Sequence, residues 1–153
     1  MYTELQKLLF SKKSDLFWDF VKQNSGYDND LAIILWMTPD TWRYWDAVWK
    51  NQKIEFKKWT SIWLDLIRYS EIFLNVSPES SEETITLFFI PDKGREKIIQ
   101  IIWIKTQKII WKLKLDETIS NSLLELNKKM PRSLNAQASL TVKDIKEFAD
   151  FII

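Results

Sequence analysis

Apolar positions in the first half of the chain recur every three or four residues, which is the spacing of an amphipathic helix. The pattern predicts one or two helices over residues 3–23. It predicts two more, one from Thr38 to about Lys50 and one over roughly 55–69. The short apolar run at 31–37 fits either a buried strand or a buried helical turn, because its length and period suit both.

In the middle of the chain, apolar and polar positions alternate, which is typical of strands. A turn sequence from Pro91 to Gly94 separates two of these stretches and makes them a hairpin. Together the stretches predict a central antiparallel meander of three or four strands, spanning about 71–115. The individual strands are expected at 71–76, 84–90, 97–105 and 108–115.

Two helices are expected after the sheet. Asp116 is suited to an N-cap, and the apolar spacing that follows continues until Pro131 ends the helix. Thr141 and Asp144 have the spacing of a capping box at the start of the last helix. The order of helices, antiparallel sheet and helices predicts a single α+β domain over residues 1–153.

Composition then narrows the chemistry. The chain has no Cys and no His, which excludes disulfides, thiolate zinc sites, cysteine nucleophiles and histidine general bases. Only two glycines are present, so glycine-rich phosphate loops are excluded as well. Asp28 and Asp30 resemble the opening of a calcium loop, but the positions that need Gly and Glu hold Ile33 and Pro39. We therefore expect a protein that is not an enzyme, with no catalytic residues, no metal and no cofactor.

Charge and hydropathy favour a cytoplasmic protein that does not enter a membrane. The first residues mix charged and apolar positions unlike a signal peptide, and no apolar run approaches the length of a transmembrane helix. The chain carries 22 Lys and Arg against 21 Asp and Glu, so it lacks the strong positive charge of a dedicated nucleic-acid binder. A local excess of lysine and arginine between Lys93 and Lys114 leaves nucleic-acid binding as a lesser alternative.

The nine tryptophans are the most unusual feature of the composition. Indoles are enriched in the energetic centres of protein interfaces, and the predicted strand at 108–115 has one face that is partly apolar and partly basic. These features favour a non-enzymatic protein-binding factor of the inhibitor, immunity or adaptor type, whose partner is another protein or a second copy of the chain. The expected partner-binding residues are Trp18, Lys105, Lys108, Ile110, Lys112 and Lys114.

The alternative function is a pocket for a small apolar or aromatic molecule, enclosed between the sheet and the tryptophan-bearing helices. In this hypothesis the indoles line the cavity instead of filling the core. The expected ligand-binding residues are Trp45, Trp49, Trp59, Trp63, Trp103 and Trp111.

Overall fold

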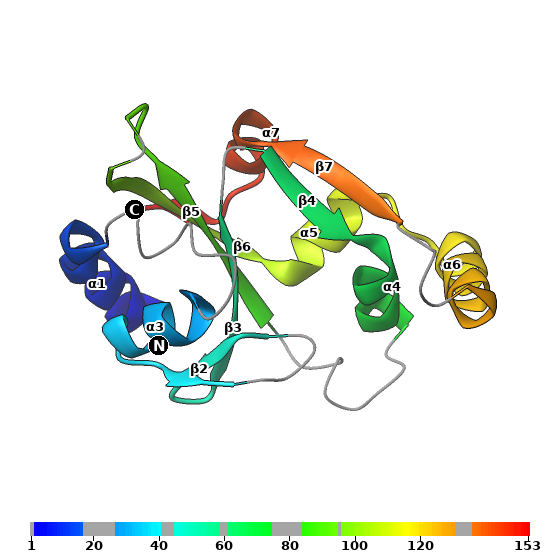
Figure 1. Ribbon diagram of the computed structural model, residues 1–153, viewed down its shortest axis with the longest axis horizontal. Coiled ribbons are helices and arrows are strands. Elements are labelled where there is room, and N and C mark those ends of the chain that lie inside the picture. Colours follow the sequence, from blue (N-terminus) through cyan, green and yellow to red (C-terminus); the bar gives the residue numbers. More distant parts are fainter. Residues whose placement is uncertain are drawn as a thin grey trace.

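The computed structural model is an α+β fold in which helices cover both faces of a β-sheet (Figure 1). The structure describes residues 2–16, 27–40, 45–58, 61–74, 84–94, 96–130 and 136–153, and the elements named here lie within these ranges.

Eight strands form two sheets. The strands are β1 (Thr38–Pro39), β2 (Ala47–Trp49), β3 (Gln52–Lys58), β4 (Ser61–Asp65), β5 (Thr84–Pro91), β6 (Ile98–Lys105), β7 (Gln137–Thr141) and β8 (Phe151–Ile152). Six of them make the main sheet, in the order β1-β2-β3-β5-β6-β8. Its neighbouring strands are antiparallel except β3 and β5, which run parallel. The other two strands, β4 and β7, form a separate antiparallel pair.

The helices divide into two layers. They are α1 (Tyr2–Lys12), the 3₁₀ helix η1 (Lys13–Asp15), α3 (Tyr27–Ile34), α4 (Leu66–Leu74), α5 (Thr106–Lys112), α6 (Glu117–Lys129) and α7 (Val142–Glu147). Helices α1 and α3 bury their apolar side chains against one face of the main sheet. Helices α4, α5 and α7 pack with β4 and β7 on the other face, and α6 lies against α4.

Strand β5 is the centre of both cores, because all of its residues are buried. Ile85, Leu87 and Phe89 belong to the core beneath α1 and α3. Phe88 and Ile90 belong to the core beneath α4 and α5. Alternate residues of a strand point to opposite faces, so a strand with a helical layer on each side has no solvent-exposed face.

The parallel pairing of β3 with β5 determines the connection between them. Two parallel neighbours cannot be joined by a tight turn, so the chain must return to the starting end of β3 before β5 begins. It does so through β4 and α4, and α4 therefore lies on the same face of the sheet as β4 (Figure 1).

The hairpin and both C-terminal helix starts are confirmed. Strands β5 and β6 pair antiparallel as expected. The Asp116 side chain accepts a hydrogen bond from the Ile119 amide at the start of α6, and Thr141 and Asp144 form the reciprocal capping box of α7. Helix α6 ends at Lys129.

Two helices predicted in the first half of the chain are wrong. The stretch from Thr38 to Lys50 contains β1 and β2, and the 55–69 stretch contains β3, β4 and only the beginning of α4. A turn with a positive φ at Lys50 joins β2 directly to β3. Hydrogen-bonded pairing between strands determines the structure of these segments. The apolar spacing that predicted a helix arises there by chance, because aromatic residues are closely spaced along the sequence.

The predicted meander is wrong at both of its ends. Residues 71–74 belong to α4, and 108–112 belong to α5. In α5 the adjacent side chains Ile109 and Ile110 are both fully buried, as the apolar face of a helix allows and a half-exposed strand does not. The central sheet is mixed, and its antiparallel hairpin β5–β6 is the part of the meander that the structure contains.

The ends of the chain differ from the expectation in smaller ways. Helix α1 and η1 account for residues 2–15 of the predicted 3–23, and residues 17–23 lie outside the described part. The ambiguous run at 31–37 begins inside α3. The last helix is short, since α7 ends at Glu147 and β8 follows it.

Within the described residues, no helix has the length and apolar character needed to cross a membrane.

We expect Phe89→Ala to destabilise the fold by about 3–5 kcal/mol, because the substitution leaves a cavity in the core. The Phe89 ring is fully buried and meets the ring of Phe56 edge-on, with centroids 5.7 Å apart. Equilibrium unfolding in urea measures the loss. Phe10→Ala is the control, because that ring is 72% exposed and its removal should change stability by less than about 0.5 kcal/mol. Equal losses for the two variants would contradict the assignment of the core.

Candidate functional site

A buried carboxylate lies on the face of β3 that α4 covers. Ile54 and Phe56 point into the core beneath α1 and α3. The intervening Glu55 and the following Lys57 therefore point to the opposite face. Glu55 is only 6% exposed. Burial of a charged carboxylate is costly unless charged or hydrogen-bonding partners compensate for the lost water.

A second carboxylate lies beside Glu55. The β2–β3 register pairs Ala47 with Ile54, and the Asp46 amide donates to the Ile54 carbonyl over 2.8 Å. Asp46 therefore lies next to Glu55 on the neighbouring strand. Its Oδ2 accepts a hydrogen bond of 2.7 Å from the amide of Phe56, the residue after Glu55. Two acidic side chains are thus held close together by the backbone of the β2–β3 hairpin.

Two cations contact the buried carboxylate. Lys57 Nζ lies 3.3 Å from Glu55 Oε1, and Arg68 Nη1 lies 3.5 Å from the same oxygen. Arg68 belongs to α4. Asp65 fixes the first turn of this helix, because its Oδ1 atom accepts hydrogen bonds from the amides of Ile67 and Arg68 at 2.9 and 3.3 Å. The connection from β3 to β5 therefore places the Arg68 guanidinium beside Glu55.

The guanidinium has one donor that remains unused. Arg68 Nε is buried and has no hydrogen-bond partner among the residues that the structure describes. Buried donors in folded proteins are nearly always paired, and this one is available to an acceptor. An anionic group of a ligand would supply that acceptor.

The surroundings change how Glu55 ionises. Burial raises the pKa of Glu55 to about 7, and the negative charge of Asp46 acts in the same direction, whereas Lys57 and Arg68 oppose it. The phenol of Tyr69, also on α4, is fully buried, and burial followed by the charge of Glu55 raises its pKa far above the ordinary value. Glu55 is therefore a carboxyl group that exchanges its proton near neutral pH.

This set of side chains has the chemistry of a site for a hard divalent cation and a phosphate. Mg²⁺ is commonly held by one or two carboxylates, with water and substrate phosphate completing its shell. Asp46 and Glu55 provide the two carboxylates, and Lys57 and Arg68 provide positive charge for phosphate oxygens. No group of three or more acidic, His or Cys side chains suited to a metal occurs among the described residues, so the cation would also need backbone oxygen or water.

The structure separates Ile110 from the other predicted partner-binding residues that it describes. Lys105 is exposed at the end of β6, Lys108 and Lys112 lie on α5, and Lys114 is exposed just after that helix. Ile110 is fully buried in the core beneath α4 and α5. Trp18 lies outside the described residues.

The predicted ligand-binding tryptophans are also dispersed. Trp49 and Trp103 are buried in the core beneath α1 and α3, where the Trp103 ring lies 4.8 Å from that of Phe151. Trp45 is buried, and its Nε1 donates to Asp40 Oδ2 over 3.0 Å. Trp111 lies on α5 and is exposed. Trp59 and the side chain of Trp63 lie outside the described part.

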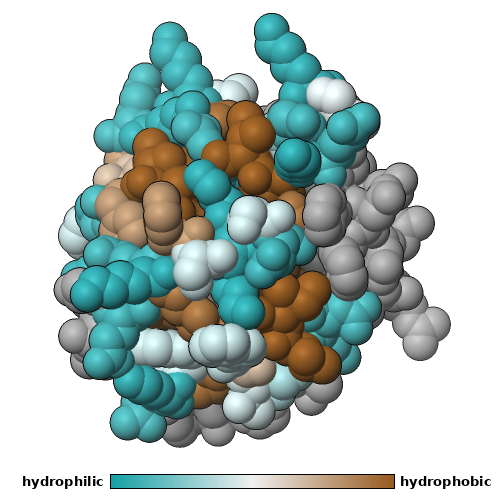
Figure 2. All heavy atoms as spheres, turned by 90° about the vertical axis from the view of Figure 1, so that its left-hand side faces the viewer, coloured by the Kyte–Doolittle hydropathy of each residue, from teal (hydrophilic) through white to brown (hydrophobic). Residues whose placement is uncertain are grey.

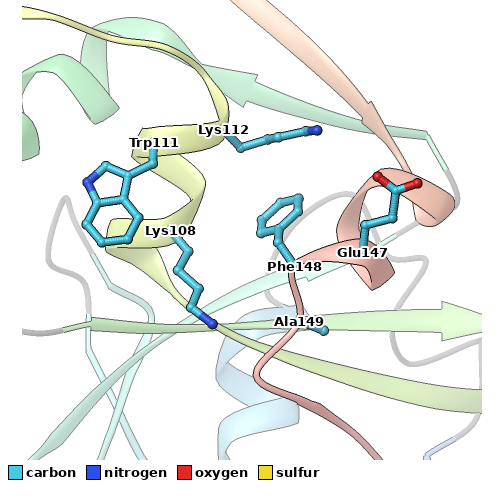
Figure 3. Close-up of a pocket in the computed structure, with 6 residues that line it drawn as sticks. All are labelled: Lys108, Trp111, Lys112, Glu147, Phe148 and Ala149. Atoms are coloured by element: carbon cyan, nitrogen blue, oxygen red, sulfur yellow. The ribbon is translucent and has the colours of Figure 1, made fainter.

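Trp111 does contribute to a pocket, between α5 and the end of α7. The pocket has a volume of about 490 Å³. Figure 3 shows the Trp111 indole extending from α5 away from Phe148, while the Lys112 side chain extends from the same helix toward the side on which Phe148 and Glu147 lie. Its lining consists of Lys108, Trp111, Lys112, Glu147, Phe148 and Ala149.

The sequence did contain a signal for the carboxylate site. Polar residues Lys53, Glu55 and Lys57 alternate with Ile54 and Phe56, which is the period of a strand. Assignment of this stretch to a helix placed the acidic and basic side chains on different faces and hid their association. The contribution of Asp46 depends on the strand register, which the sequence does not specify.

No family model and no curated protein sequence matches this chain.

We expect the stability of the protein to fall between pH 4.5 and pH 7 because of Glu55. Its pKa is about 7 in the folded chain against 4.5 in the unfolded one, so the folded state holds the proton more tightly in this interval. Stability is lost as pH rises wherever the folded state binds more protons, here by about 3 kcal/mol over the whole interval. Urea unfolding at a series of pH values measures the slope.

Glu55→Gln removes this titration, so its unfolding free energy should decline less between pH 4.5 and pH 7 than that of the wild-type protein. Glu125→Gln is the matched control, because Glu125 lies on the exposed surface of α6. Identical pH profiles for wild type and Glu55→Gln would contradict the raised pKa.

Proposed function

We propose that the chain is a divalent-cation-dependent hydrolase of phosphodiesters, acting on nucleic acid. The observation that supports this best is the pair of carboxylates on neighbouring strands, Asp46 and Glu55, with Lys57 directly beside the buried one. The sequence alone favoured a non-enzymatic protein, and that remains an untested prediction. The proposal rests on this specific arrangement of two carboxylates and the cations beside them.

The present contacts of Glu55 suggest what changes when a cation binds. Without a cation, Lys57 and Arg68 neutralise the carboxylate. A cation on Asp46 and Glu55 would take over that neutralisation and release the two side chains to contact a phosphate. Arg68 would then use its unpaired Nε together with an Nη group, which is the fork geometry that guanidinium groups present to phosphate oxygens.

The reaction we propose is a hydrolysis. A bound divalent cation supplies Lewis acidity, which polarises a phosphate oxygen and lowers the pKa of a coordinated water. The oxygen of the attacking water forms a bond to phosphorus while the bond from phosphorus to the ester oxygen breaks. One proton passes from the water to a base, and the departing oxygen receives a proton. Lys57 and Arg68 stabilise the extra negative charge on the phosphate.

Nucleic acid is the substrate that fits the charges around the site. Strand β3 carries Lys53 and Lys57 on the same face as Glu55, so positive side chains lie on both sides of this carboxylate along the strand. Lysines of this kind contact successive backbone phosphates without reading base sequence. Glu55 also gives the reaction a pH dependence, because its proton competes with the cation.

We expect purified protein to cleave a fluorescent oligonucleotide in Mg²⁺ or Mn²⁺ and to lose this activity in EDTA. Asp46→Asn and Glu55→Gln should each reduce the rate at least about 100-fold, because each removes a charged ligand of the cation. Activity of the wild type should rise from pH 6 to pH 8 as Glu55 ionises.

Glu125→Gln is the control and should retain wild-type activity, since that carboxylate lies on exposed α6. Circular dichroism verifies that each variant is folded. Absence of cleavage by the wild-type protein, or full activity of folded Glu55→Gln, would refute the proposed function.

A second candidate function, protein binding, is supported by a different side of the molecule. Figure 2 shows hydrophobic side chains gathered in patches between hydrophilic ones on the side that bears α1 and α3. Phe10 is 72% exposed and lines a groove with the C-terminal residues Phe151 and Ile152. Strand β8 ends the main sheet there, and an edge strand can pair with the same strand of a second copy.

Trp36 adds to the case for an interface on this side. Its indole is 71% exposed, and its φ of 58° lies in the left-handed region that side chains rarely adopt. Lys12 Nζ lies 4.2 Å from the centre of the ring. The positive φ closes α3, because the amides of Trp36 and Met37 donate to the carbonyls of Ile33 and Ala32. The exposure of the indole is what favours a role in binding.

If this side joins two copies, sedimentation velocity of the wild-type protein should show a dimer at about 100 µM, and Phe10→Ser with Ile152→Ser should give monomers. Phe10 and Ile152 are both exposed, so the substitutions should leave the fold intact. Leu126→Ser is the control, because Leu126 is exposed on α6, in the other helical layer. A wild-type monomer at this concentration would exclude self-association through this surface.

A further inference from the structure

The pocket between α5 and α7 presents an indole that the core does not use. Helix α5 buries Ile109 and Ile110 completely, whereas Trp111 is 67% exposed. Figure 3 shows Phe148, from the end of α7, on one side of α5, and the Trp111 indole extending from α5 on the other side. An exposed indole offers a surface on which a planar ring can stack.

Two lysines of the pocket are groups that can contact an anionic ligand. Residues 105–115 contain four lysines and no acidic residue. Two of these lysines, Lys108 and Lys112, line the pocket, and Lys112 Nζ lies 5.8 Å from the centre of the Phe148 ring. Lys108 also makes a charged hydrogen bond of 2.5 Å with Asp150. Positive groups next to a stacking surface match a nucleotide, which joins a planar base to a phosphate.

The pocket also provides a hydrogen-bond acceptor. Glu147 lines it from the end of α7 and is exposed. A carboxylate accepts hydrogen bonds from the amino and ring N–H groups of a base but repels phosphate. The base would therefore stack on Trp111, with its phosphate toward the lysines and away from Glu147.

Helix α5 connects this pocket to the carboxylate site. The parallel register places Thr86 of β5 opposite Glu55 of β3. The Thr86 and Thr106 hydroxyls hydrogen-bond over 2.8 Å, and Thr106 is the first residue of α5. Trp111 follows five residues later, about 7.5 Å along the helix. Both sites lie on the face of the sheet that α4 and α5 cover.

We propose that the α5–α7 pocket binds an unpaired nucleotide of the nucleic-acid strand, with its base stacked on Trp111 and its phosphate held by Lys108 and Lys112. The proposal rests on the proposed hydrolase function and extends it, since it assigns a binding site separate from Asp46 and Glu55. The pocket would hold the strand next to the cleavage site and would favour single-stranded substrates over duplexes.

The test measures binding separately from cleavage. Fluorescence anisotropy with a labelled single-stranded oligonucleotide, in EDTA, reports the dissociation constant without hydrolysis. Trp111→Ala should weaken binding about 10-fold, because stacking of a base on an aromatic ring contributes on that scale. Lys112→Ala should reduce the slope of log affinity against log salt by about 1. Binding of the matching duplex should change less than about 2-fold in Trp111→Ala.

Two controls distinguish this inference from the proposed function. Lys128→Ala removes an exposed lysine of α6 and should leave single-strand binding unchanged within about 2-fold. Glu55→Gln should abolish cleavage while its affinity for the oligonucleotide in EDTA stays within about 3-fold of wild type. Trp111 is exposed, so its removal should not disturb folding.

Wild-type affinity of Trp111→Ala for single strands would overturn the pocket assignment even if cleavage persists. A Trp111 that affects binding of a protein but not of an oligonucleotide would overturn it as well. Binding that depends on Trp111, combined with a wild-type protein that cleaves nothing, would support the pocket and refute the hydrolase.

Discussion

The parallel pairing of β3 with β5 is the constraint on which the rest of the structure depends. It requires a crossover, and the crossover brings α4 over the face of β3 that carries Glu55 and Lys57. The same pairing makes β5 a strand covered on both faces, so the two cores meet along it. The charged cluster around Glu55 therefore follows directly from the topology of the sheet.

Local signals in the sequence predicted those elements whose ends are fixed by nearby residues. The β5–β6 hairpin and the caps at Asp116 and Thr141 are of this kind. Strands β2 and β3 could not be predicted in this way, because their pairing with each other and with β5 outweighs a helix-like spacing of aromatic residues. The association of Asp46 with Glu55 needs the register of that pairing, so it became visible only in the structure.

The two sites on the α4 and α5 face differ in what the sequence revealed. The basic character of residues 105–114 was visible, but a strand was expected where α5 forms, so Ile110 was placed on the surface and Trp111 on the opposite face. The helix reverses both assignments, since Ile110 is buried and Trp111 is exposed. The pocket, which is lined by two lysines and two aromatic rings, forms because this segment is a helix and not the predicted strand.

Calorimetric titration with Mn²⁺ measures whether Asp46 and Glu55 bind a divalent cation. We expect one site in the wild-type protein, with tighter binding at pH 8 than at pH 6 and release of protons at the lower pH, because Glu55 has a pKa of about 7. Asp46→Asn should lose the site. No binding at pH 8, or equal binding by wild type and Asp46→Asn, would refute cation binding by these two carboxylates.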